Sequence, residues 1–127
     1  MALSNPVGEF EFTSRGLSVS DPTSSGGGSV TVDYEGTATG YGTVASSMTF
    51  TVQEAGAKNG TVSANNIAWL ENGDSLSGVS SGVFSSSGTN TWRVRAMVVV
   101  SDGTVLLSEG DISLAEQTYK GNLYAWE

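Results

Sequence analysis

Residues 29–39 read Ser-Val-Thr-Val-Asp-Tyr-Glu-Gly-Thr-Ala-Thr, and apolar and polar side chains alternate through the first half of this stretch. Val30, Val32 and Tyr34 fall on one face of an extended chain, whereas the hydroxyl and carboxylate side chains between them fall on the other. A period of two residues is typical of a β-strand that buries one face and exposes the other. This stretch therefore predicts a strand whose valines and tyrosine face a core.

The same period recurs along most of the chain, and turn residues such as Asp102-Gly103 separate the apolar runs. Asn59-Gly60 is a dipeptide that strongly favours a tight hairpin, so a turn is predicted there. Residues 22–28 are rich in Ser and Gly, and we expect them to form a flexible loop. The expected strands cover residues 9–13, 29–39, 43–54, 61–71, 75–86, 91–101, 104–109 and 118–126.

About eight sequential strands joined by short turns predict an antiparallel up-and-down β-barrel. Closing the sheet into a barrel removes the exposed strand edges that invite aggregation. A β-sandwich, or an open sheet that pairs its edges between subunits, is the alternative. A chain of 127 residues is the usual size of one domain, so residues 1–127 are expected to form a single barrel domain.

The composition excludes several classes of function. The chain has no cysteine and no histidine, which excludes disulfides, thiolate chemistry and Ser-His-Asp catalysis. Five basic residues against thirteen acidic ones argue against nucleic acid and anionic membranes as partners. No motif calls for a metal or a cofactor. The chain has no long apolar run and no leader pattern, so we expect a soluble protein, cytoplasmic or secreted and processed.

An eight-stranded barrel is wide enough to fill with side chains or to hold one small ligand. Small residues such as Gly36 and Gly78 share the apolar faces with large ones, and they either leave space for a ligand or mark bends in the strands. One of Asn65 and Asn66 is expected to point at the apolar face, where its amide needs partners. The expected ligand-binding residues are Phe50, Met48, Asn66, Phe84, Trp92, Arg93 and Tyr119.

Arg93 and Arg95 lie two residues apart on one expected strand, so they point to the same side of it. They either face outward toward carboxylates on neighbouring strands, such as the pairs Glu9/Glu11 and Asp33/Glu35, or face inward to hold an anionic ligand or an internal carboxylate. An unpaired buried charge costs several kcal/mol, so the inward placement needs a partner.

Met97 and Val99 continue the arginine side of this strand. That side is therefore not purely polar, which suggests either a subunit contact or a partly covered surface. A homo-oligomer is the expected state of assembly.

Without histidine and cysteine, catalysis is confined mainly to carboxylate, phenol, amide and guanidinium groups. A carboxylate in an apolar pocket has its proton affinity raised, which suits it to acid–base work near neutral pH. Glu109 follows the apolar run at 105–107, and Tyr34 offers a phenol on an apolar face. The candidate catalytic set is therefore Glu109, Tyr34 and Arg95.

The stretch Tyr34-Glu-Gly-Thr-Ala-Thr-Gly-Tyr-Gly-Thr43, followed by a strand through Met48 and Phe50, resembles the glycine-punctuated hairpins of allene-oxide-cyclase-like and dirigent-like barrels. The resemblance implies an eight-stranded barrel, often oligomeric, that confines an apolar or reactive substrate without a cofactor. No catalytic residue of those families carries over, because no matching motif surrounds one in this sequence.

Three hypotheses of function follow. The first is a barrel that binds an apolar or aromatic small molecule and, if it is an enzyme, catalyses a cofactor-free isomerisation or cyclisation. The second is a structural or surface interaction module of an assembly such as a virion, an appendage or an extracellular layer. The third is a carbohydrate-binding module that uses Trp69 or Trp126 as a stacking platform.

Overall fold

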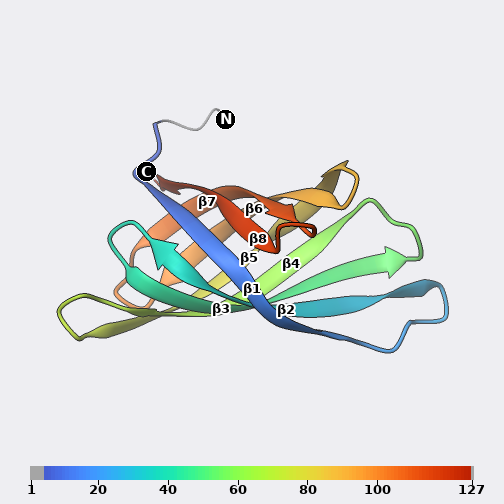
Figure 1. Cartoon of the computed structure of the whole chain (residues 1–127), viewed down its shortest axis with the longest axis horizontal. Coiled ribbons are helices and arrows are strands. Elements are labelled where there is room, and N and C mark those ends of the chain that lie inside the picture. The colour runs from blue at the N-terminus through green and yellow to red at the C-terminus, as the bar shows by residue number, and fades with distance from the viewer. Residues whose placement is uncertain (1–4, 127) are drawn as a thin grey trace.

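The computed structural model describes residues 5–126, and they form a closed barrel of antiparallel strands that follow one another in sequence order (Figure 1). The predicted up-and-down barrel is confirmed, and the sandwich and open-sheet alternatives are wrong, because the last strand pairs with the first. Residues 5–126 include no helix that is long and apolar enough to cross a membrane. The strands are β1 (Gly8–Val19), β2 (Gly26–Ala38), β3 (Gly42–Glu54), β4 (Asn59–Trp69), β5 (Ser75–Gly88), β6 (Thr91–Val100), β7 (Val105–Ser113) and β8 (Thr118–Ala125).

Three strands, β1, β2 and β7, extend by three or more residues beyond their predicted bounds. β1 continues to Val19 through a register shift between Ser14 and Gly16, which is a β-bulge. β2 begins at Gly26, inside the predicted loop 22–28, because Gly26 and Gly28 pair with β3. β7 runs to Ser113 and not to 109, since the period of two continues past residue 109.

The predicted turn at Asn59-Gly60 is wrong, because both residues belong to β4. The chain turns before them, where the N–H of Ala57 donates to the carbonyl of Glu54 at 3.3 Å and Gly56 has a φ of 76°. Gly60 instead lies against β3 and the ring of Phe84, because a Cβ at this position would collide with the carbonyl oxygen of Thr51 and come within 2.9 Å of that ring. Tertiary packing, and not a turn, therefore explains this glycine.

The centre of the barrel is filled by a layer of aromatic rings, which we call the aromatic layer: Phe10, Phe12, Tyr34 and Tyr119. Ring centroids are 4.8 Å apart for Phe10 and Tyr119 and 5.7 Å apart for Tyr34 and Tyr119. Each of the four side chains is at most 9% exposed. Such tilted and edge-to-face contacts stabilise a core beyond the area they bury.

Inward glycines serve two different purposes. A Cβ on Gly36 would collide with the carbonyl oxygen of Glu11 and lie 2.8 Å from the Cα of Phe12, so this glycine lets β1 approach β2 closely. Gly82 is similarly close to Ala96, whose Cα would be 2.6 Å away. Gly78, by contrast, has no atom nearer than 3.4 Å and lines a cavity. The packing interpretation holds for the first two, and the open-space interpretation holds for Gly78.

The turns alternate between the two ends of the barrel. The β1–β2, β3–β4, β5–β6 and β7–β8 turns gather at one end, which we call the wide end; the other end, the terminal end, carries the remaining turns and the N and C labels in Figure 1. On β4 the inward residues are Val62, Ala64, Asn66 and Ala68. The prediction that one asparagine faces the core is thus confirmed, and it is Asn66.

Candidate functional site

A pocket of about 680 Å³, which we call the wide pocket, opens at the wide end of the barrel. Its wall includes the aromatic side chains of Tyr34, Phe50, Phe84 and Trp92, contributed by β2, β3, β5 and β6. Val32 and Ile112 add aliphatic surface. None of the residues that line it within 5–126 is acidic or basic. This is the size and apolar character of a ligand pocket.

Apolar side chains contribute to both the floor and the rim of the wide pocket. The rings of Phe50 and Phe84 meet edge to face, with centroids 5.5 Å apart and planes inclined by 82°. Leu17, Val19 and Leu114 stand exposed at the rim. Sequence reasoning missed these three because they lie near the ends of expected strands or outside them. Exposed apolar side chains gathered around a concave site are typical of ligand or partner binding.

Tyr34 supplies a polar group among the aromatic side chains of the wide pocket, whose lining also includes four serines and Gln117. Its side chain is 5% exposed, and burial raises the pKa of its phenol to about 12, so the hydroxyl is protonated at neutral pH. No side-chain hydrogen bond among residues 5–126 involves this hydroxyl, and no fully buried side-chain oxygen there lacks a partner, so the hydroxyl reaches the solvent of the pocket. A protonated phenol can both donate and accept one hydrogen bond. It is therefore free to bond a ligand in the pocket.

A second, smaller cavity of about 100 Å³ lies on the other side of the aromatic layer, and we call it the inner cavity. Met48, Asn66 and Tyr119 line it. Asn66 is fully engaged, since Ser46 Oγ donates to its Oδ1 at 2.6 Å and its Nδ2 donates to Ser80 Oγ at 2.9 Å. An apolar cavity of about 150 Å³ holds one benzene molecule, so this smaller cavity has room for only a few non-hydrogen atoms. The Asn66 amide therefore holds β3, β4 and β5 together and has little hydrogen-bonding capacity left for a ligand.

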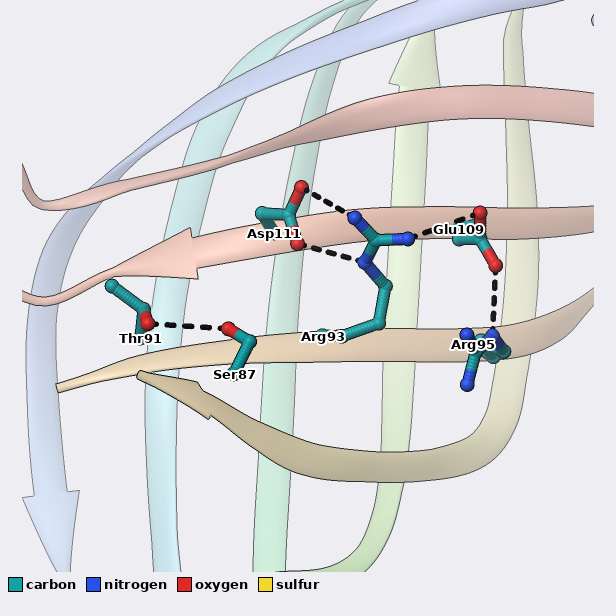
Figure 2. Close-up of polar contacts among 6 residues, drawn as sticks. All are labelled: Ser87, Thr91, Arg93, Arg95, Glu109 and Asp111. Atoms are coloured by element: carbon teal, nitrogen blue, oxygen red, sulfur yellow. Dashed lines mark hydrogen bonds and ion pairs between the residues drawn. The ribbon is translucent and has the colours of Figure 1, made fainter. Parts of the chain in front are cut away.

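The two arginines face outward, and their carboxylate partners lie on β7 (Figure 2). Arg93 binds Asp111 through two hydrogen bonds of 2.8 and 3.1 Å and approaches Glu109 at 3.3 Å. Arg95 Nε donates to Glu109 at 2.7 Å. The outward interpretation of the arginines is therefore the one that the structure supports. The partners are Glu109 and Asp111, not the carboxylate pairs of β1 and β2 that the sequence analysis considered.

The predicted site residues fall into three groups. Tyr34, Phe50, Phe84 and Trp92 meet in the wide pocket, whereas Met48, Asn66 and Tyr119 belong to the inner cavity. Arg93, Arg95 and Glu109 form the outer ion network and reach neither space. Of the candidate catalytic set, only Tyr34 is placed to touch a ligand.

The terminal end carries a broad groove whose lining is partly charged. Glu9, Glu11, Trp69 and Lys120 contribute to it. Trp69 and Trp126 are both about half exposed, as a stacking platform for a sugar requires. The groove differs from the wide pocket in that carboxylates and a lysine line it.

No metal centre is indicated, since no three acidic side chains within residues 5–126 lie close enough together to hold an ion.

No protein-family model, curated protein or solved structure matches this chain. The chemistry of the site therefore rests on its own geometry.

Proposed function

We propose that this protein binds an uncharged, largely aromatic small molecule in the wide pocket, through apolar contact and one hydrogen bond to Tyr34. The observation that carries the proposal is the protonated phenol, without a partner among the described residues, in the wall of an uncharged pocket of about 680 Å³. Small-molecule sites typically combine a mostly apolar lining with a few polar groups that fix orientation.

The lining of the pocket selects against charge. A charged ligand would lose part of its hydration without gaining an ion partner, and that loss costs several kcal/mol. Phe50, Phe84 and Trp92 favour a flat ligand, because aromatic rings attract one another in edge-to-face and offset arrangements. A hydrogen-bond acceptor such as a carbonyl oxygen would satisfy Tyr34. The ligand class is therefore a neutral aromatic compound that carries an acceptor.

Catalysis would have to use Tyr34, since Glu109 and Arg95 lie outside the barrel. The isomerisation or cyclisation implied by the family resemblance would then depend on confinement of the substrate and on one hydrogen bond from a phenol. Positioning alone can supply a large part of a rate acceleration. Binding is the activity that we propose. If the protein is also an enzyme, its reaction would take place in the same pocket.

Energy transfer from tryptophan to a bound probe tests this proposal. N-phenylnaphthylamine is neutral and aromatic and absorbs where tryptophan emits, and anilinonaphthalene sulfonate is its anionic counterpart. We expect the neutral probe to bind and the anionic one to bind at least about tenfold more weakly, since the pocket offers no cation. Trp92 lines the wide pocket, whereas Trp69 lies at the terminal end.

The matched variants are Trp92→Phe and Trp69→Phe, each of which removes one donor and keeps an aromatic ring. Transfer weakens with distance, so Trp92→Phe should lose more of the sensitised emission than Trp69→Phe. Equal transfer in both variants, or a preference for the anionic probe, would place binding elsewhere and contradict the proposal.

A further inference from the structure

The outer surface of the barrel has two halves of different chemistry. On β1–β3 the outward side chains are mainly threonines and carboxylates, such as Thr31, Asp33 and Glu35. On β5–β8 a group of large apolar side chains faces outward. We call this group the outer apolar face, and it consists of Val79, Val83, Met97, Val99, Leu107 and Tyr124.

The outer apolar face is continuous from strand to strand. Val79 lies opposite Val99, Met97 lies opposite Leu107, and Leu107 lies opposite Tyr124. Val79, Val83, Met97 and Val99 are 60%, 55%, 40% and 46% exposed. Directly opposite residues of an antiparallel pair have Cβ atoms about 5 Å apart, so these side chains are neighbours along the sheet. A contiguous apolar patch of this kind is typical of a protein interface.

The distribution of charge indicates what covers this face. Arg93 and Arg95 border it, and they are balanced by Glu109 and Asp111. The whole formal net charge of −8 therefore lies on the rest of the chain. Two copies of an acidic protein repel each other least when they approach through a surface without net charge. A cationic partner, by contrast, would be drawn to the carboxylates of β1 and β2.

The closed barrel also limits how a second molecule can attach. β1 pairs with β8 along its first half, so no free edge is available there for a further strand. The second half of β1, residues 16–19, pairs with β2 alone, but the outer apolar face lies on β5–β8, where each strand is paired on both sides. Association through that region therefore uses a face of the sheet. Arg95 is 61% exposed and contacts Glu109 through Nε, and its two terminal nitrogens have no partner among residues 5–126. They are placed at the border of the apolar face, free to meet a carboxylate across an interface.

We propose that the outer apolar face binds the same face of a second copy of this chain. A two-fold contact is self-complementary, so each copy covers the valines and Met97 of the other. Arg95 of each copy then lies near Glu109 of the second copy at the border. This association is independent of the wide pocket, which opens at one end of the barrel and shares no residue with this face.

Sedimentation velocity of the full chain, from low micromolar to several hundred micromolar, tests this inference. We expect a reversible dimer that persists at high salt, because apolar contact holds it and screening weakens the repulsion between acidic copies. Val99→Lys should weaken dimerisation at least tenfold. The substitution adds a positive charge to an acidic chain, so loss of the dimer could not come from increased net repulsion.

Two further variants make the outcome decisive. Thr37→Lys introduces the same charge on the exposed outer surface of β2 and should leave the dimer intact. The urea midpoint will show whether Val99→Lys folds as well as the wild type. If it does not, Val79→Ser serves as the test in its place, because it lies on a strand already rich in outward serines, and it should also weaken the dimer. A monomer at every concentration, a dimer unaffected by both substitutions on the face, or a complex with another protein that excludes self-association would overturn the inference.

Discussion

Replacing Gly36 by alanine should destabilise the barrel by about 3 kcal/mol or more. A Cβ at this position would collide with the carbonyl oxygen of Glu11 and lie 2.8 Å from both the Cα and the ring of Phe12. These contacts are largely with backbone, which cannot rotate aside as a flexible side chain can. Overpacking of a core costs roughly 1–3 kcal/mol and more where strands must move apart. Urea unfolding followed by tryptophan fluorescence gives the difference.

Gly16→Ala is the matched control for this measurement. Gly16 lies at the bulge of β1, where an added Cβ meets nothing within 4 Å. Alanine there should change the free energy of unfolding by less than about 1 kcal/mol, and a small gain is expected because alanine restricts the unfolded chain. Equal effects of the two substitutions would mean that β1 and β2 are not packed as closely as described.

Stability should fall as the pH rises from about 10 to 12, by about 1.4 kcal/mol per pH unit for each buried tyrosine that titrates. Burial raises the pKa of Tyr34 to about 12 and raises that of Tyr119 further. In the unfolded chain both phenols lose their protons near the ordinary pKa of 10.0. Above that pH the unfolded state binds fewer protons than the folded one, so each further pH unit favours unfolding. Below pH 10 the contribution is fully present.

Tyr34→Phe isolates this effect, because it removes one titrating group and keeps the ring. The urea midpoint of the variant should decline less steeply between pH 10 and 12 than that of the wild type. Tyr124→Phe, which removes a phenol of the outer apolar face, is the comparison variant, measured at a concentration at which the chain is monomeric. Parallel declines in the wild type and Tyr34→Phe would show that the Tyr34 phenol is not buried.

The period of two was sufficient to predict most of the fold. It identified Val30, Val32 and Tyr34 as inward residues, and repetition of that pattern made a closed antiparallel barrel the simplest solution. The sequence pattern failed where residues that commonly form a turn lie in a strand. Asn59-Gly60 favours a turn by sequence alone, yet both residues pair with β5 and belong to a strand.

The partners of the arginines were missed although the sequence contains the signal. Counting outward from the Asp102-Gly103 turn, Arg95 falls opposite Glu109 and Arg93 falls opposite Asp111, as the register of β6 and β7 shows. Both pairs have the same spacing of two residues and opposite charge. The register of this hairpin therefore identifies the carboxylate partners of the arginines, which composition and periodicity do not.

The separation of the candidate ligand residues into two spaces could not be predicted from the sequence. Met48 and Phe50 lie two residues apart on β3, yet one lines the inner cavity and the other the wide pocket. That division depends on where the aromatic layer crosses the barrel, which is set by the register of all the strands together. Phe10 and Tyr119 come together only because β1 pairs with β8.

The central claim, a neutral aromatic ligand bonded to Tyr34 in the wide pocket, is tested most directly by calorimetric affinities for two probes of equal shape. One is methyl naphthyl ketone, which has an acceptor, and the other is isopropenylnaphthalene, in which a methylene group replaces the carbonyl oxygen. The wild type should bind the ketone roughly three to ten times more tightly, the value of one hydrogen bond of about 1 kcal/mol. Tyr34→Phe should bind both equally, and Glu109→Gln should keep the preference. A ketone preference that survives Tyr34→Phe, or no binding of either probe, would contradict the account.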